Sequence, residues 1–196
     1  QLVFLYLYYA ENTGSVNLTQ IAKALSLSKA TCTRAINDLS ASGLISQTAE
    51  GTNKWITTAY TKSELLEKAY GRLKTPVDRI LYVKGTAQIE HPIASGIRAL
   101  ARQSMIGVND QDGAIAISKK EAAKIPAEDI CTKQYFEDFG GAVIEVWSYD
   151  PIILERDGCV DDISLLLSMD NDPNERVQTC LDEIRQKHGL PIKEEE

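Results

Sequence analysis

The sequence has few of the residues that build metal centres, disulfide frameworks and catalytic sites. Its 196 residues include four cysteines without a Cys-x-x-Cys pair, and only two histidines that could assist them as ligands. It contains no P-loop, no Gly-x-Gly-x-x-Gly, no His-Glu-x-x-His and no nucleophile elbow. We therefore predict no metal site, no cofactor and no enzymatic activity. We interpret Cys32 and Cys180 as small hydrophobic residues in a reducing cytoplasm, with redox sensing through Cys32 as the alternative.

Long apolar runs are also lacking. The stretch LVFLYLYYA at residues 2–10 is too short to span a bilayer, which needs about 20 residues, and it has no charged lead-in typical of a signal peptide. We predict no membrane segment and interpret these residues as the first helix. The sequence leaves open whether this helix packs only within its own domain or also against a second subunit.

Charge is distributed unevenly along the chain. Residues 1–75 hold eight Lys or Arg against five Asp or Glu, a net charge of +3, whereas residues 76–196 hold thirteen against twenty-three, a net charge of −10. Pro76 follows a helix predicted over residues 61–75, so we place a domain boundary there. The prediction is a basic domain at residues 1–75 and an acidic domain at residues 76–196.

Apolar spacing near the start of the chain is typical of a helix-turn-helix. Asn17 can cap a first helix over residues 18–25, and Gln20 at its third position completes a capping box. Ser28 can cap a second helix that ends at Gly43. The buried stripe of the second helix is predicted at Cys32, Ala35, Ile36 and Leu39.

The opposite face of the second helix carries mostly short side chains that can donate hydrogen bonds. A helix that lies in the major groove of DNA presents such side chains to base edges and phosphates. The net positive charge of the same domain favours attraction to phosphate. We therefore predict DNA contacts from Lys29, Thr31, Thr33, Arg34 and Asn37.

Two strand-like segments follow and predict a hairpin, LISQTA at residues 44–49 and KWITTA at residues 54–59, which makes the domain a winged helix. Lys54 near the hairpin tip can reach a phosphate or the minor groove, while Trp55 is predicted to pack back on the helices. A winged helix can instead be a protein–protein module whose exposed helix face is only solvated. The local positive charge favours DNA over this alternative.

The lead-in LVFLYLYYAENTGSVNLTQIAKAL, the helix-turn-helix and the SGLI step into the wing resemble winged-helix regulators of the MarR-like type. The resemblance covers roughly the first third of the chain. It implies that the second helix reads the major groove, with Ser28, Lys29, Thr33, Arg34 and Asn37 as reading positions. The wing departs from the common pattern because it is short and carries a single Lys.

The acidic domain alternates predicted strands and helices around a small sheet. Pro92 is predicted to open a helix that continues to residue 105. The predicted strands are RILYVKG at residues 79–85, AIAIS at residues 114–118 and AVIEVWSYD at residues 142–150.

Aspartates recur in the last part of the chain. Asp161 is predicted to cap the helix DISLLLSM, and Asp172 to cap the last helix, with Pro173 at its first position and Glu175 at its third. A divalent-metal site is the alternative for such a cluster. We interpret the cluster as helix caps and turn residues: Asp157, Asp161, Asp162, Asp170 and Asp172.

The order RILYVKG, ASGIRALARQSMI, AIAIS and DDISLLLSMDNDPNERVQTCLDEI is similar to the C-terminal domains joined to winged helices in abortive-infection antitoxin regulators. This resemblance implies a domain that serves regulation or toxin neutralisation. It supplies no catalytic residue.

The sequence thus predicts a two-domain α+β protein, with an N-terminal winged helix-turn-helix followed by a second α+β domain that contains a small sheet. We predict a cytoplasmic, sequence-specific transcriptional repressor that binds a double-stranded DNA operator as a homodimer. Two alternatives stay open. One is an antitoxin-like neutraliser that binds a toxin-like partner protein through the acidic domain and also represses its own promoter. The other is a ligand-gated sensor with a pocket in the second domain.

Overall fold

The structure is a computed structural model that describes residues 1–10, 16–50, 53–85, 87–107 and 113–193. Contacts between residues divide the chain into two compact units. The first unit contains Gln1–Lys74 and Arg185–Glu196, and the second contains Thr75–Ile184. The sequence predicted a single second domain over residues 76–196. The contacts instead place the residues from Arg185 onward in the first unit.

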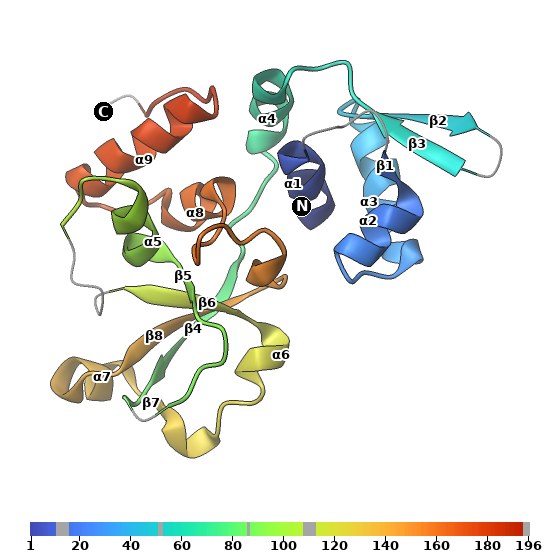
Figure 1. Cartoon of the computed structure of the whole chain (residues 1–196). Helices are drawn as coiled ribbons and strands as arrows, with labels where there is room; N and C mark the ends of the chain where they lie inside the picture. Colours follow the sequence, from blue (N-terminus) through green and yellow to red (C-terminus); the bar gives the residue numbers. More distant parts are fainter. Residues whose placement is uncertain (11–15, 51–52, 86, 108–112, 194–196) are drawn as a thin grey trace. The chain divides into compact units, whose positions relative to one another are not determined.

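The first unit combines short helices with a small antiparallel sheet. Its elements are α1 (Leu2–Tyr9), β1 (Val16–Asn17), α2 (Leu18–Ala24), α3 (Lys29–Ala41), β2 (Ser46–Glu50), β3 (Asn53–Thr57) and α4 (Lys62–Tyr70). Strand β3 lies between β1 and β2 and is antiparallel to both. The β2–β3 hairpin extends beyond α2 and α3 (Figure 1), so the unit has the form of a winged helix.

Side-chain caps set where its helices begin. At α2 the amide of Gln20 donates to Asn17 Oδ1 and the amide of Asn17 donates to Gln20 Oε1, each at 3.0 Å, which confirms the predicted capping box. Ser28 caps α3 as predicted, and a second capping box at Thr61 starts α4. Gly43, just after α3, has a φ of 72°, a left-handed conformation that glycine adopts without steric cost.

Helix α1 is buried almost all round within the chain. It packs on α3 and α4, and the Tyr8 hydroxyl lies 2.7 Å from Nδ1 of His188, which belongs to the same unit. Packing within the chain therefore accounts for this apolar helix and leaves little apolar surface for a second subunit. Its buried residues are Leu2, Val3, Phe4, Leu5, Leu7 and Tyr8. No helix in the described part of the chain is long and apolar enough to cross a membrane.

The second unit is a mixed sheet with helices on both faces. The strand order is β5-β6-β8-β4-β7, with β6 and β8 parallel and the other neighbours antiparallel. The strands are β4 (Val77–Val83), β5 (Ile93–Ala94), β6 (Ala114–Ser118), β7 (Ile130–Cys131) and β8 (Ala142–Trp147). The helices are α5 (Gly96–Gln103), α6 (Lys119–Ala122), α7 (Lys133–Phe139), α8 (Asp162–Met169) and the first part of α9 (Glu175–Lys187), with 3-10 turns η2 (Ala127–Asp129) and η3 (Pro151–Ile153).

Alternate residues of the central strands face two different layers. One face of the sheet is covered by α6 and the other by α5 and α8 (Figure 1). Strand β8 is therefore buried on both faces along its second half. The apolar cluster on the α6 side consists of Val83, Ile115, Ile117, Ala122, Ile144 and Val146.

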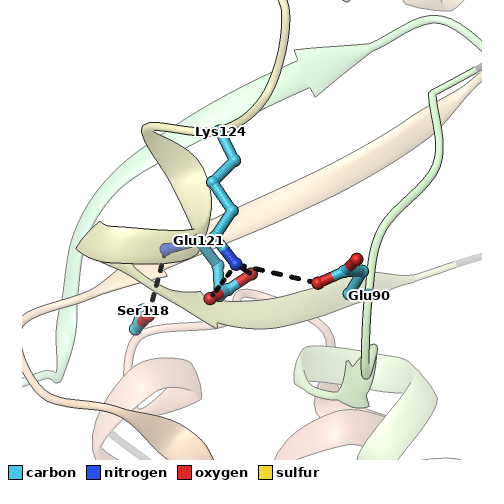
Figure 2. A network of polar contacts seen from close by, with 4 residues as sticks. All are labelled: Glu90, Ser118, Glu121 and Lys124. Atoms are coloured by element: carbon cyan, nitrogen blue, oxygen red, sulfur yellow. Dashed lines mark hydrogen bonds and ion pairs between the residues drawn. The ribbon is translucent and has the colours of Figure 1, made fainter.

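Polar contacts tie α6 to the segment that precedes β5. Ser118 Oγ accepts a hydrogen bond from the amide of Glu121 at 3.2 Å and so caps α6. Lys124 Nζ lies 2.8 Å from Glu121 Oε1 and 3.7 Å from Glu90 Oε2, so one ammonium lies between two carboxylates (Figure 2). Because Lys124 and Glu90 are exposed, these ion pairs position the segment more than they stabilise it.

The prediction that a helix begins at Pro92 is wrong. Residues Ile93 and Ala94 pair with β6 as strand β5, and α5 begins only at Gly96. Pairing with a strand some twenty residues away thus overrides the local helical pattern.

The start of the last helix is also misplaced. Asp172 Oδ1 accepts from the amide of Asn174 in a turn, and Asn174 Oδ1 accepts from the amide of Arg176, so α9 begins at Glu175. The prediction for α8 is confirmed, because Asp161 accepts from the amide of Ser164 at 3.0 Å.

Besides the Asp161 cap of α8, the second unit buries the carboxyl group of Glu145. Glu145 on β8 is 8% exposed, and its Oε2 accepts a hydrogen bond from Trp147 Nε1 at 3.0 Å. Burial raises the pKa of Glu145 above its ordinary value, while the hydrogen bond from Trp147 opposes the shift. The folded state therefore favours the neutral carboxyl more than the unfolded state does.

This shift predicts a pH dependence of stability. Because the folded pKa of Glu145 is raised, its contribution to the free energy of unfolding is fully present below the ordinary value of 4.5 and is lost as pH rises through the folded pKa. Glu145→Gln keeps an acceptor for Trp147 and should remove this loss. Denaturant unfolding at a series of pH values measures it, with Glu183→Gln, an exposed site on α9, as the control. An unchanged pH slope in Glu145→Gln would contradict the assignment.

Candidate nucleic-acid interface

Helix α3 has one face in the core and one face in solvent. Cys32 and Ile36 are buried, as predicted, and Ala35 and Leu39 beside them are half-buried. Of the predicted reading positions, Thr33 is half-buried and the others are exposed: Ser28, Lys29, Thr31, Arg34 and Asn37. The structure therefore gathers the predicted set on the exposed face of α3 and at its N-terminus.

The short hydroxyl side chains of this face already bond within the helix. Ser28 Oγ accepts from the amide of Thr31 at 3.1 Å and lies 2.8 Å from Thr31 Oγ1. Thr33 Oγ1 donates to the carbonyl of Lys29 at 2.8 Å. These three hydroxyls shape the first turns of α3, so the larger hydrogen-bonding capacity for a ligand lies with the longer polar side chains.

Those longer side chains are Lys29, Arg34 and Asn37. The Lys29 ammonium is exposed at the first turn of α3. Arg34 Nε donates to the carbonyl of Ala30 at 3.4 Å, which aligns the side chain along the helix and leaves its terminal nitrogens as donors. Ala30 itself is exposed and small, so a ligand can approach the helix closely between Lys29 and Arg34.

Asn37 is held by a residue that the sequence did not single out. Gln47 Nε2 on β2 donates to Asn37 Oδ1 at 3.3 Å, so the wing orients an amide of the helix. The Nδ2 group of Asn37 then remains a donor, and its Oδ1 keeps a second lone pair. No local pattern marks Gln47, because its place opposite α3 depends on the register of the hairpin, in which Gln47 pairs with Ile56.

Of the two wing residues singled out in the sequence, the structure describes the side chain of Trp55 but not that of Lys54. Lys54 belongs to β3, but its side chain lies outside the described residues, so its proposed phosphate contact stays a prediction. Trp55 is half-buried and lies opposite Asn17 on β1 and Thr48 on β2. Its position in the middle strand of the small sheet favours packing over intercalation.

The electrostatics of the N-terminus of α3 favour an anion. The first turn carries no acidic residue, while Lys29 adds a positive charge there. Peptide dipoles place a partial positive charge at a helix N-terminus, and nothing in this turn neutralises it. Asp38 is an exposed acidic residue farther along the same helix, so the positive end lies toward Lys29 and Arg34.

Comparison with known proteins agrees with this geometry over one part of the chain. Residues 2–54 match the model of the MarR family. The matched range holds α1, the helix-turn-helix and the first strand of the wing, and it ends at the beginning of β3. The first unit therefore carries a MarR-like winged helix, the DNA-binding module of a family of transcriptional regulators. Neither the curated proteins nor the solved structures contained a match to this chain. The similarity of the second domain to abortive-infection antitoxin regulators stays a prediction.

From the hydrogen bond by which Ser28 caps α3, we predict a loss of stability when Ser28 is replaced. Replacing Ser28 by Ala removes the acceptor for the amide of Thr31 and should lower the free energy of unfolding by about 1 kcal/mol. Ser40→Ala in the same helix is the control, because Ser40 does not cap and its replacement should cause no such loss. Denaturant unfolding of both variants provides the measurement. Equal stability of Ser28→Ala and the parent chain would show that the cap contributes nothing.

Proposed function

We propose that this chain is a sequence-specific DNA-binding transcriptional regulator that acts as a repressor. The observation that carries the proposal is the exposed face of α3, where Lys29, Arg34 and Asn37 reach solvent from a helix anchored in the core. Arg can bond a guanine edge with two donors, Asn can bond an adenine edge, and Lys can contact a phosphate. This face therefore combines base reading with backbone contact.

Two further features support DNA as the ligand of this face. The N-terminus of α3 offers a positive helix end without an acidic neighbour in its first turn, which suits a phosphate beside the groove. Residues 1–75 carry a net charge of +3, and residues 76–196 a net charge of −10. DNA phosphates therefore attract the basic first unit and repel the acidic part of the chain.

Repression follows as the simplest consequence of operator binding. A protein seated on a promoter excludes other proteins from that stretch of DNA without needing a catalytic residue. The acidic second unit offers no favourable electrostatics for DNA and is free for other contacts.

The proposal predicts that Arg34 carries base-specific affinity. Sequences selected from a random DNA pool should converge on a site, and Arg34→Ala should weaken binding to that site by about 1–3 kcal/mol. Lys62→Ala is the matched control, because Lys62 is an exposed cation at the start of α4 rather than on α3. Gel-shift titration compares the two variants. The proposal of a sequence-specific repressor would be contradicted if no DNA sequence were enriched at low salt. It would also be contradicted if both variants lost equal affinity for the selected site.

We also propose that the regulator binds its operator as a homodimer. One recognition helix reads only a few base pairs, so regulators of this kind gain specificity by placing two helices on half-sites about one DNA turn apart. Because α1 is largely buried within the chain, it offers little further apolar surface for the subunit contact.

Light scattering tests the assembly directly. The expected mass on a two-half-site operator is DNA plus twice the 21.6 kDa of one chain. An operator cut to one half-site is the control and should bind a single chain more weakly. A single chain on the full operator at saturating protein would rule out the dimer.

A further inference from the structure

Helix α7 differs from the other helices of the second unit because it buries none of its residues. It contains three aromatic residues among seven, yet no residue of the helix is buried. Phe139 is 73% exposed and Tyr135 is 37% exposed. Aromatic side chains are usually buried from water, and an exposed apolar patch often marks a site where another protein binds.

Two ring contacts involve the aromatic residues of α7. Phe136 packs on Tyr82 of β4, with ring centroids 5.4 Å apart, and the rings of Tyr135 and Phe139 lie 4.8 Å apart. We call Tyr82, Tyr135, Phe136 and Phe139 the α7 aromatic face. Ile80, two residues before Tyr82 on the same side of β4, is 42% exposed and extends the apolar surface.

The charges around this face are predominantly negative. Residues 126–140 contain one lysine against four acidic residues, and that lysine, Lys133, pairs with Glu137 at 3.4 Å. Lys84 Nζ donates to the carbonyl of Glu128 and lies over the ring of Tyr135. Within the described ranges, no Lys or Arg forms an ion pair with the remaining acidic residues, Glu128, Asp129 and Asp138.

We propose that the α7 aromatic face is a docking surface for a partner protein, and that the docking segment carries an apolar or aromatic side chain beside Lys or Arg. Aromatic residues are enriched in the buried centres of protein interfaces, and a rim of carboxylates without an ion-pair partner in the described ranges selects a cationic partner. The surface lies entirely in the second unit and does not depend on the DNA-binding proposal.

Charge argues against a second copy of this chain as the occupant. Two copies that met through this face would bring two segments of net charge −3 together, whereas a basic partner replaces that repulsion with attraction. Charge complementarity therefore favours a different, basic protein.

Selection from a phage-displayed library of random peptides of roughly 12 residues on the intact chain tests this surface. Enriched peptides should have a net positive charge and at least one aromatic or large aliphatic residue. A labelled peptide from the selection should bind Phe139→Ser about tenfold more weakly, or worse, than the parent chain. Met105→Ser is the matched control, because Met105 is fully exposed in the same unit but outside the α7 aromatic face, and it should leave affinity unchanged.

A second variant tests charge separately from packing. Asp138→Lys should weaken the same peptide, and this loss should shrink as salt is added. Acidic or neutral enriched peptides, the absence of any enriched peptide, or unchanged affinity in Phe139→Ser would overturn the proposal. So would sedimentation data in which the chain self-associates and Phe139→Ser abolishes that association, because the occupant would then be a second copy. Phe139→Ser should keep operator binding and Arg34→Ala should keep peptide binding, so failure of one proposal is seen apart from failure of the other.

Discussion

Burial of Cys32 and Ile36 fixes the rotation of α3 about its own axis, and the chemistry of its exposed face depends on that rotation. A helix turns by about 100° per residue, so a change of anchor by one position would carry Arg34 toward the core and an apolar residue toward solvent. The caps at its two ends, Ser28 and Gly43, fix its length in the same way. The side chains that we propose read DNA are therefore oriented before any ligand arrives, and the hydrogen bond from Gln47 extends this orientation to Asn37.

The two units divide their surface chemistry. The first presents cations and amides on a rigid helix, whereas the second presents aromatic rings bordered by carboxylates. Each surface rests on a core of its own: the first on α1 and the helix-turn-helix, and the second on a sheet covered by helices on both faces. The carboxylates that would attract a basic partner to the second unit repel DNA. The proposed partner and DNA therefore need not compete for the same surface.

Sequence predicted best those features that depend on neighbouring residues. The starts of α2, α3, α4 and α8 follow from a side chain that bonds an amide three positions later, as in Asp161 and Ser164. Features that depend on distant pairing escaped prediction. Ile93 and Ala94 join a strand because β6 lies beside them, and Gln47 reaches Asn37 only once the hairpin register is set. Short elements between residues 119 and 139, such as α6 and α7, span too few turns to show a periodic pattern.

The position of Cys32 also bears on redox chemistry. The side chain is fully buried under the exposed face of α3, and burial raises the pKa of its thiol. Oxidants and alkylating reagents attack the thiolate, which this environment disfavours. Cys131 and Cys180, both half-buried, are therefore more accessible to such reagents than the thiol beneath the helix that we propose reads DNA. An oxidative change in the surroundings would thus reach the second unit before it could disturb that helix.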